Sequence, residues 1–269
     1  MTQSAHVFDG LPGPLLDALR VLARTPQLTV ALDFDGVLAP LVDRPGDARG
    51  DSNSLKAIAD LVELSGTTVV LVSGRSLDNL RTVSGSPGNV LLVGSHGAEY
   101  DIGDGQAGMS LTAEEKRALT ELQGAMRDVV SRHPDARLEY KPAGVTLHTR
   151  GVNPDAARAA QRDASRTVSA AVPGVTHRSG KDVLEFSVVA ATKGDAMQRL
   201  RLHTAATAML YAGDDITDED AFAALEPGDL SVKVGEGSTV ASHRVHGTPE
   251  VAQMLRVLAS DRRNHLLGA

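Results

Sequence analysis

Short apolar runs alternate with amphipathic segments in the first and last parts of the chain. Near-continuous apolar runs are typical of strands buried on both faces, as in a parallel sheet. Such runs occupy Leu28–Leu32, Thr67–Val72, Val90–Val93, Ala208–Ala212 and Leu230–Val234. Apolar residues at helical spacing, or helix-start signals, predict helices at Gly13–Arg24, from Ser54 after a polar loop at Asp43–Asn53, from Gly194, from Thr217 with Asp220 as its capping partner, and from Thr248. Strands that alternate with helices predict an α/β fold with a Rossmann-like parallel sheet and right-handed crossovers.

The pattern changes between Asp101 and Val188, where polar and apolar residues alternate along the candidate strands. Such alternation is typical of an antiparallel sheet with one face in water. Leu138–Lys141 and Val145–His148 flank a Pro-Ala-Gly turn and predict a hairpin, and Val183–Phe186 shows the same alternation.

Helix-start signals in this middle segment add helices to its sheet. Thr112 and Glu115 predict a capping box, and Asn153-Pro154 predicts the start of a second helix. We therefore expect an inserted, smaller α/β domain within a parallel α/β core. The expected limits are 1–100 and 189–269 for the core and 101–188 for the insert.

Composition and charge narrow the class of protein. With 269 residues, 42% hydrophobic and 23% charged, the chain is long enough to bury a sizeable core and is not of the disordered class. A formal net charge of −7 argues against nucleic acid or an anionic membrane as a partner. The absence of Cys excludes disulfides and thiolate metal ligands. Because no basic region precedes an apolar one at the N-terminus, we expect no secretory signal and no membrane span, and hence a cytoplasmic location. We also expect a monomer.

Two aspartates follow directly after the first apolar run, in the sequence LTVALDFDGVL at Leu28–Leu38. Asp33 and Asp35 are two residues apart, so a strand directs both to one face while Phe34 points away. Ligands of open α/β sheets gather outside the carboxyl ends of the strands, and Gly36 allows the backbone to bend there. The alternative is that Asp33 only ends the strand in a turn, because Asp-Gly pairs are common turn signals.

A second acidic cluster, GDDITDED at Gly213–Asp220, follows another apolar run. Two unit charges ~4 Å apart repel by about 4 kcal/mol at an effective dielectric constant of about 20, so two such clusters need a compensating charge to approach each other. Oxygen ligands without Cys suit a hard cation, and Mg²⁺ commonly binds one or two carboxylates, water and substrate phosphate. The two clusters therefore predict a Mg²⁺ site.

Four short motifs, in order at the ends of predicted elements, resemble those of the haloacid-dehalogenase-like phosphohydrolases. They are Asp33–Leu38 (DFDGVL), Ser73-Gly74-Arg75, Lys193-Gly194, and Gly213-Asp214-Asp215 with Asp218. Val37 stands where Thr is the commoner residue, within the family pattern. Each motif alone is weakly specific, and their order along the chain makes the resemblance strong. The resemblance implies a Rossmann-like parallel-sheet haloacid-dehalogenase core that hydrolyses phosphate esters through an aspartyl-phosphate.

A narrower resemblance, over roughly Thr29 to Val234, is to the trehalose-6-phosphate phosphatases. It rests on Gly94–Glu99 (GSHGAE), Glu139-Tyr140-Lys141, His148 with Arg150, Gly180-Lys181 with Glu185, and GDDITDEDAF from Gly213. The insert would then be the α/β cap of that family, placed after the third core strand.

The resemblance implies a role for each acidic residue. Asp33 would attack phosphorus, and Asp35 would protonate the departing sugar oxygen and then deprotonate the attacking water. Crowding among the carboxylates would raise the pKa of Asp35, as this role requires. Mg²⁺ would be held by Asp33, the Asp35 carbonyl and Asp214. Asp215 and Asp218 would bind its water molecules or act as further ligands, and the sequence does not rank these two.

The resemblance also implies phosphate binding by Ser73, Gly74 and Lys193, through a hydroxyl, backbone N–H groups and a charge. Taken alone, Ser73-Gly74-Arg75 could be only a turn, and Lys193 could be a surface lysine at a helix start.

Sugar contacts are implied for a further set of polar residues. They are Arg75, His96, Glu139, Lys141, Lys181 and Glu185. A disaccharide has many hydroxyls to satisfy, and each unpaired buried group costs ~1–3 kcal/mol. The alternative is that the residues of the insert form a solvated sheet face and that His96 makes a structural hydrogen bond.

The motifs together predict a Mg²⁺-dependent phosphatase of trehalose biosynthesis, whose partner is the small molecule trehalose 6-phosphate and whose products are trehalose and phosphate. The nearest alternative is another sugar-phosphate phosphatase of the same plan, of the sucrose-phosphate or mannosyl-phosphoglycerate type. A non-catalytic sugar-phosphate-binding module is the alternative from a different class. The presence of every expected catalytic residue argues against that module.

Overall fold

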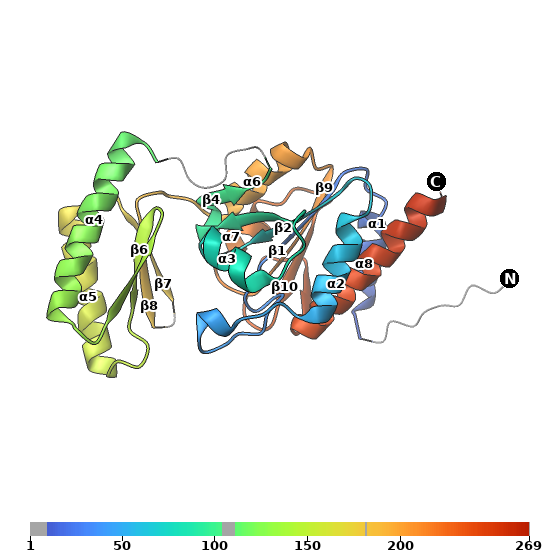
Figure 1. Cartoon of the computed structure of the whole chain (residues 1–269). Helices are drawn as coiled ribbons and strands as arrows, with labels where there is room; N and C mark the ends of the chain where they lie inside the picture. The colour runs from blue at the N-terminus through green and yellow to red at the C-terminus, as the bar shows by residue number, and fades with distance from the viewer. Residues whose placement is uncertain (1–9, 104–110, 181, 269) are drawn as a thin grey trace. The chain divides into compact units, whose positions relative to one another are not determined.

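The chain forms two compact units in the structure, a computed structural model that describes residues 10–103, 111–180 and 182–268. The core unit is Met1–Ala107 with Thr192–Ala269, and the inserted unit is Gly108–Ala191 (Figure 1). Each unit is built on a sheet of its own. Within the described ranges, every helix is too short or too polar to span a lipid bilayer.

The core unit contains a seven-stranded sheet in the order β11-β10-β9-β1-β2-β3-β4. Its strands are β1 (Leu28–Leu32), β2 (Thr67–Val72), β3 (Leu91–Gly94), β4 (Glu99–Asp101), β9 (Ala208–Gly213), β10 (Leu230–Val234) and β11 (His243–Val245). Neighbouring strands are parallel except β3 and β4, which are antiparallel. The predicted α/β fold with a Rossmann-like parallel sheet is confirmed, and the edge strand β4 makes the sheet mixed.

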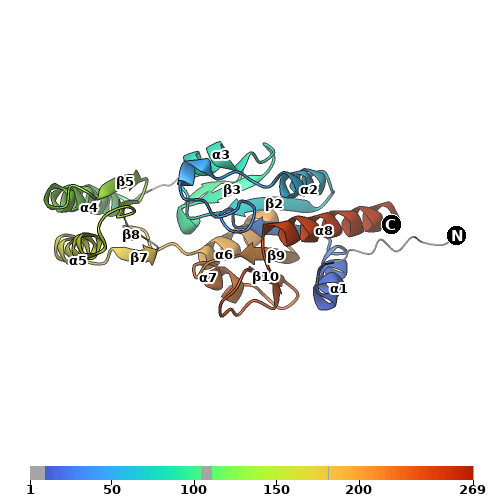
Figure 2. The same ribbon diagram turned by 90° about the horizontal axis from the view of Figure 1, so that it is seen from below.

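Helices cover both faces of the core sheet. They are α1 (Gly13–Leu22), α2 (Ser52–Val62), α3 (Leu77–Ser84), α6 (Lys193–Thr204), α7 (Asp218–Ala223) and α8 (Thr248–Gly268), with short 3₁₀ helices η1 (Pro45–Asp47) and η2 (Ser95–Gly97). Along β1, Leu28, Val30 and Leu32 pack with α1, α2, α3 and α8, whereas Ala31 packs with α6 and α7. Figure 2 shows α8 lying between α1 and α2. Because Asp33 is two residues after Ala31, the alternation places it on the face that α6 covers.

The inserted unit contains a four-stranded antiparallel sheet in the order β5-β6-β8-β7. Its elements are α4 (Ala113–Arg132), β5 (Arg137–Lys141), β6 (Gly144–His148), α5 (Pro154–Ala171), β7 (Thr176–Gly180) and β8 (Val183–Ser187). Figure 1 shows α4 and α5 side by side along one face of this sheet, where Val145, Leu147, Leu184 and Phe186 form the core with both helices. The polar residues of the alternation therefore lie on the opposite face.

Two local predictions in the inserted unit are confirmed. The hairpin is present, with β5 and β6 joined by Pro142-Ala143. The capping box of α4 is present as well: the Thr112 hydroxyl accepts the Glu115 N–H at 3.2 Å, and the Glu115 carboxylate accepts the Thr112 N–H at 2.7 Å.

One predicted helix start is shifted, and one predicted cap is absent. α2 begins inside the predicted loop, because the Asp51 carboxylate accepts the N–H groups of Asn53 and Ser54 at 3.0 and 2.9 Å. α7 (Asp218–Ala223) starts directly after Thr217, as predicted, but the backbone of Thr217 is helical (φ −69°, ψ −17°) and its side chain makes no capping hydrogen bond to the described residues. The next residue, Asp218, is instead completely buried.

The hydrophobic pattern missed one α-helix, three strands and the two 3₁₀ helices, and it shifted several boundaries. α3 and the strands β4, β7 and β11 were not predicted; β7, with the sequence THRSG, has no apolar run to reveal it. α1 ends at Leu22 rather than Arg24. α6 begins at Lys193 rather than Gly194, because Thr192 and Asp195 form a capping box ahead of it.

Candidate active site

Three aspartates gather at the carboxyl ends of β1 and β9. One carboxylate oxygen from each of Asp33, Asp214 and Asp218 lies within 4.8 Å of the others. β1 and β9 are parallel neighbours with Leu32 opposite Ala212, so Asp33 and Asp214 leave adjacent strands at the same edge of the sheet. The Asp33 N–H extends this ladder by donating to the Ala212 carbonyl at 2.9 Å. The two predicted acidic clusters are therefore brought together.

A buried lysine lies among these carboxylates. Lys193, in the first turn of α6, is 2% exposed, and its Nζ donates to Asp33 Oδ2 at 2.8 Å and to Asp218 Oδ1 at 2.6 Å. Asp33 Oδ1 accepts the N–H of Phe34 at 2.6 Å. Burial raises the pKa of Asp33 well above 3.8, and the charges of Asp218 and Asp214 raise it further, although Lys193 lowers it. Burial alone would lower the pKa of Lys193, but the two carboxylates outweigh burial and raise it.

Asp218 receives hydrogen bonds at both carboxylate oxygens. Oδ1 accepts from Lys193 and, at 2.7 Å, from the buried hydroxyl of Tyr211 in β9. Oδ2 accepts the backbone N–H of Asp215 at 2.8 Å. The exposed carboxylate of Asp215 itself turns to the N–H of Ile216 at 2.6 Å. Of the two aspartates that the sequence does not rank, Asp218 is the one in the cluster.

Asp214 is the most accessible carboxylate of the cluster. Burial and the charges of Asp218 and Asp215 raise its pKa to about 7, while Lys193 and Lys233 act in the opposite direction. Its carbonyl accepts a hydrogen bond from Lys233, a buried lysine of β10. Its carboxylate packs against Gly36, where an added Cβ would lie 2.0 Å from Asp214 Oδ2.

Asp35 lies outside the carboxylate cluster and forms a bidentate ion pair with Arg75. Arg75 Nε donates to Asp35 Oδ2 at 2.6 Å and Nη2 donates to Oδ1 at 2.7 Å. The same guanidinium donates to Asn79 Oδ1 and to the Pro45 carbonyl, and it lies 5.6 Å above the Phe34 ring. The crowding expected at Asp35 thus occurs at Asp33 and Asp214, because a cation occupies the space beside Asp35.

The predicted phosphate-binding turn follows β2. The N–H of buried Ser73 donates to the Val93 carbonyl at 2.9 Å, and its hydroxyl accepts the N–H of Arg75 at 3.2 Å. Gly74 adjoins the ring of His96, and an added Cβ would lie 2.5 Å from His96 Cε1. His96 itself adopts a left-handed conformation, with φ +57°. The turn after β2, with Ser73 and Gly74, therefore lies against His96 in η2 after β3, and the roles of these residues toward a substrate stay predictions.

Three of the predicted sugar-contact residues lie on the polar face of the inserted sheet. Lys141 Nζ donates to Glu185 Oε2 at 2.7 Å, and Glu139 Oε2 lies 2.8 Å from His148 Nε2. Lys181, the fourth residue predicted in this domain, lies outside the described residues. Lys141, Glu185 and Glu139 are thus each hydrogen-bonded to another side chain of the inserted sheet.

Sequence reasoning missed two residues that hold the cluster. Tyr211 and Lys233 lie in the buried strands β9 and β10, within MLYAG and LSVKV. A lysine inside a mostly apolar strand is itself a signal, because a buried lysine requires a partner. Tyr211 gave no such signal, because Tyr is an ordinary strand residue.

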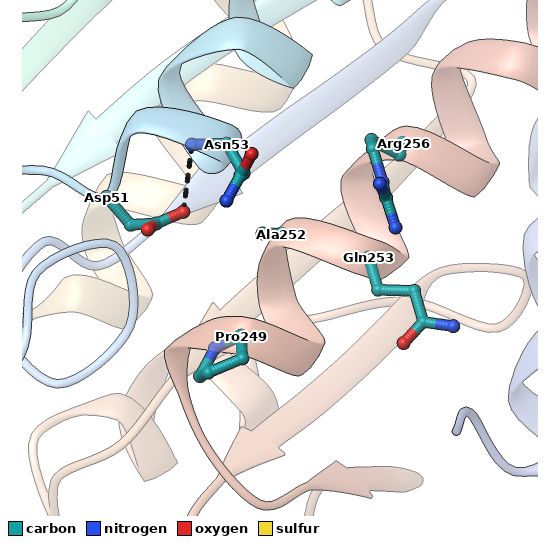
Figure 3. A pocket seen from close by; sticks show the side chains of 6 residues that line it. All are labelled: Asp51, Asn53, Pro249, Ala252, Gln253 and Arg256. Carbon is teal, nitrogen blue, oxygen red and sulfur yellow. Dashed lines mark hydrogen bonds between the residues drawn. The ribbon is translucent and has the colours of Figure 1, made fainter. Parts of the chain in front are cut away.

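A pocket of about 230 Å³ elsewhere in the core unit lies between the start of α2 and the first turns of α8 (Figure 3). Its lining residues are Asp51, Asn53, Pro249, Ala252, Gln253 and Arg256. The Asp51 carboxylate caps α2 there. None of the predicted site residues lines this pocket, so it is separate from the aspartate cluster.

The parallel sheet and the aspartate cluster at its carboxyl edge define a haloacid-dehalogenase-like protein. A haloacid dehalogenase-like hydrolase from Bacillus subtilis has the same fold, with a TM-score of 0.57 and 16% identity over 85% of this chain and 98% of that one. The trehalose-phosphatase family model matches residues 31–253. The chain belongs to the trehalose-phosphatase family.

Named relatives agree with this assignment. The trehalose-phosphate phosphatase of Mycobacterium marinum is 31% identical over 265 residues, which cover 91% of this chain and 66% of that protein, so this chain spans just under two thirds of its length. The trehalose-6-phosphate phosphatase of Escherichia coli is 29% identical over 89% of this chain and 91% of its own length. The C-terminal domain of Candida albicans trehalose-6-phosphate phosphatase shares the fold, with a TM-score of 0.77 and 24% identity over 93% of this chain and 97% of that one.

Proposed function

We propose that this chain is a Mg²⁺-dependent phosphatase that hydrolyses trehalose 6-phosphate to trehalose and phosphate. The observation that carries the proposal is the convergence of Asp33, Asp214 and Asp218 around Lys193 at the carboxyl edge of the core sheet. The family and the names of the relatives support the choice of substrate.

The donor set fits a hard divalent cation. The atoms that converge are carboxylate oxygens, which are the ligands that hard cations prefer. Burial and mutual repulsion raise the pKa values of Asp33 and Asp214, and a nearby cation would offset that repulsion. Asp33, Asp214, Asp218 and the Asp35 carbonyl would hold Mg²⁺. When bound, the ion neutralises charge between the phosphate dianion and the carboxylates.

Asp33 supplies the nucleophile in the proposed reaction. Its carboxylate oxygen forms a bond to phosphorus while the bond from phosphorus to the sugar oxygen breaks, which leaves an aspartyl-phosphate. Asp35 gives its proton to the departing sugar oxygen and then takes one from the water that attacks phosphorus, so that phosphate leaves and Asp33 is regenerated. For this role Asp35 has to leave Arg75, because both of its carboxylate oxygens accept hydrogen bonds from the guanidinium and neither is turned to a sugar oxygen.

Phosphate binding in the proposal falls to Lys193, Ser73 and the backbone at Gly74. Lys193 already contacts the nucleophile, so an ammonium beside Asp33 would also neutralise charge on an incoming phosphoryl oxygen. The sugar would contact Glu139, Lys141, Lys181 and Glu185 of the inserted unit, with Arg75 and His96 on the core unit.

The proposal is tested by phosphate release from trehalose 6-phosphate, glucose 6-phosphate and sucrose 6-phosphate, with Mg²⁺ and with a chelator. We expect Mg²⁺-dependent release from trehalose 6-phosphate alone, and its loss in Asp33→Asn. Asp220→Asn is the matched control, because this aspartate of α7 is exposed and lies outside the cluster. Release from every ester would refute the substrate, and release that persists in Asp33→Asn would refute the nucleophile.

A further inference from the structure

The polar face of the inserted sheet contains a hydroxyl that the described part of the chain leaves unsatisfied. Thr146 lies on β6, an inner strand, and is 4% exposed. Its Oγ1 is buried and has no hydrogen-bond partner among the described residues. Buried polar atoms are nearly always paired, because an unpaired one loses its hydration without replacement. Among the described residues, the Thr146 hydroxyl therefore lacks the partner that a buried polar group normally has.

Two glutamates flank this hydroxyl across the sheet. Thr146 is directly opposite Glu139 of β5 and Glu185 of β8. Directly opposite residues have Cβ atoms ~4.5–5.5 Å apart and project from the same face. Either glutamate is therefore placed where its carboxylate could accept a hydrogen bond from the Thr146 hydroxyl. The three side chains form one polar row across three strands.

Both glutamates are engaged by other donors. Glu139 pairs with His148, and Glu185 pairs with Lys141. Lys141 belongs to β5, so its side chain has to cross β6 to reach Glu185 on β8, and it can do so beside Gly144, the residue directly opposite it. Glu185 is therefore bound to a charged donor, which forms a stronger hydrogen bond than a neutral hydroxyl, and Glu139 is bound to a ring nitrogen of His148.

Other hydroxyls on the same face are satisfied by the backbone. Ser187 Oγ donates to the Val189 carbonyl at 2.9 Å, and Thr176 Oγ1 donates to the Ser187 carbonyl at 3.1 Å. Both lie near the end of the sheet, where loop carbonyls are within reach. Thr146 is at the middle of its strand, where the ladder already occupies the carbonyls.

We propose that Thr146 is a specificity-determining residue whose hydroxyl pairs with a hydroxyl of the sugar moiety of the substrate. This inference rests on the proposed function, because it takes the substrate to be a sugar phosphate. A sugar hydroxyl both donates and accepts, so it can pair with the Thr146 hydroxyl in either direction. A site built to pair a substrate hydroxyl discriminates strongly against ligands that lack it.

The test compares Thr146→Val, which removes the hydroxyl at nearly constant shape, with Thr146→Ser, which keeps it. We expect the valine variant to raise KM for trehalose 6-phosphate about tenfold, with kcat little changed, and the serine variant to restore KM to near the wild-type value. An unchanged KM in the valine variant would overturn the inference.

Thermal stability distinguishes sugar binding from a role in folding. Thr149 is also buried in this unit, but its hydroxyl donates to the Asp182 carbonyl at 3.1 Å and accepts from Gln161 at 3.0 Å. Thr149→Val should therefore lower Tm by roughly 3–8 °C, whereas Thr146→Val should leave Tm unchanged or raise it. A similar fall in Tm for both variants would show that Thr146 has a structural partner, and would overturn the inference.

A binding measurement separates failure of this inference from failure of the proposed function. If the wild-type protein hydrolyses none of the sugar phosphates, the proposed function fails, and saturation-transfer NMR with trehalose then tests Thr146 without turnover. A signal from the wild type and Thr146→Ser that is lost in Thr146→Val would support the inference. Equal signals from all three proteins, or no signal from the wild type, would overturn it.

Discussion

Removal of the buried lysine is the sharpest perturbation of the aspartate cluster. Lys193→Met keeps most of the apolar stem but deletes the charge that binds Asp33 at 2.8 Å and Asp218 at 2.6 Å. All three groups are almost completely buried, so water cannot replace the ammonium. In the absence of metal, the variant protein has to accommodate Asp33, Asp214 and Asp218 without that compensating charge.

The size of the effect follows from these distances. Each attraction amounts to ~6 kcal/mol at an effective dielectric constant of about 20, and the burial of the ions offsets most of it. Removal of one partner from a buried ion pair typically costs ~3–5 kcal/mol, because the other charge is left unpaired. We expect a loss of that order in the free energy of unfolding at about pH 8, with a chelator present.

The loss should depend on pH in a defined direction. Lys193 lowers the pKa of Asp33, so its removal raises that pKa further above 3.8. A carboxyl whose pKa is higher in the folded state loses stability as pH rises from its unfolded pKa through its folded pKa. The deficit of Lys193→Met relative to wild type should therefore be smaller at about pH 5 than at about pH 8.

Urea unfolding followed by circular dichroism measures this difference at both pH values. Lys56→Met is the matched control, because Lys56 is exposed on α2 of the same unit and its removal should change stability by less than ~0.5 kcal/mol. The reasoning is refuted if Lys193→Met is as stable as the control at about pH 8, or if its deficit is the same at both pH values.

Three further predictions concern the core unit. The pKa of Asp214 is raised to about 7 and that of Asp33 is also raised, so the unfolding free energy of the metal-free wild type should fall as pH rises from about 4 to about 7, by at most ~4 kcal/mol for Asp214. Mg²⁺ should reverse this fall, and a flat pH profile in urea titrations would contradict the prediction. Gly36→Ala should weaken Mg²⁺ binding at least about tenfold by calorimetry, because its Cβ would lie 2.0 Å from Asp214 Oδ2 and its φ is +74°; unchanged affinity would exclude Asp214 as a ligand. Arg262→Met should lower the unfolding free energy in urea titrations by ~3–5 kcal/mol, because the buried guanidinium donates to four carbonyls and one hydroxyl. A loss below ~1 kcal/mol would show that water takes over the hydrogen bonds of the guanidinium.

The positions of the acidic residues at strand ends could be predicted from the chain alone. Leu28–Leu32 is a buried strand, and Asp33 follows it directly, as the apolar pattern indicated. The capping box at Thr112 and Glu115 was equally readable. Both depend on residues within a few positions of each other, so local periodicity and local hydrogen bonding determine them.

The partners of those side chains were decided by the tertiary structure. Asp35 was expected among the crowded carboxylates, but the fold places it against Arg75. The sequence did not rank Asp215 and Asp218, and only the fold showed that Asp218 is the one that meets Lys193. Such choices depend on which helix covers which face of the sheet, a property of strand order rather than of local pattern.

Thr146 shows the same division within a single strand. Its place on the polar face follows from the alternation along β6, which the sequence determines by itself. Its hydroxyl has no partner among the described residues, while the glutamates opposite it, Glu139 and Glu185, are engaged by His148 and Lys141. Strand register and the competition among neighbouring donors exist only in the folded sheet, because they join residues that are far apart along the chain.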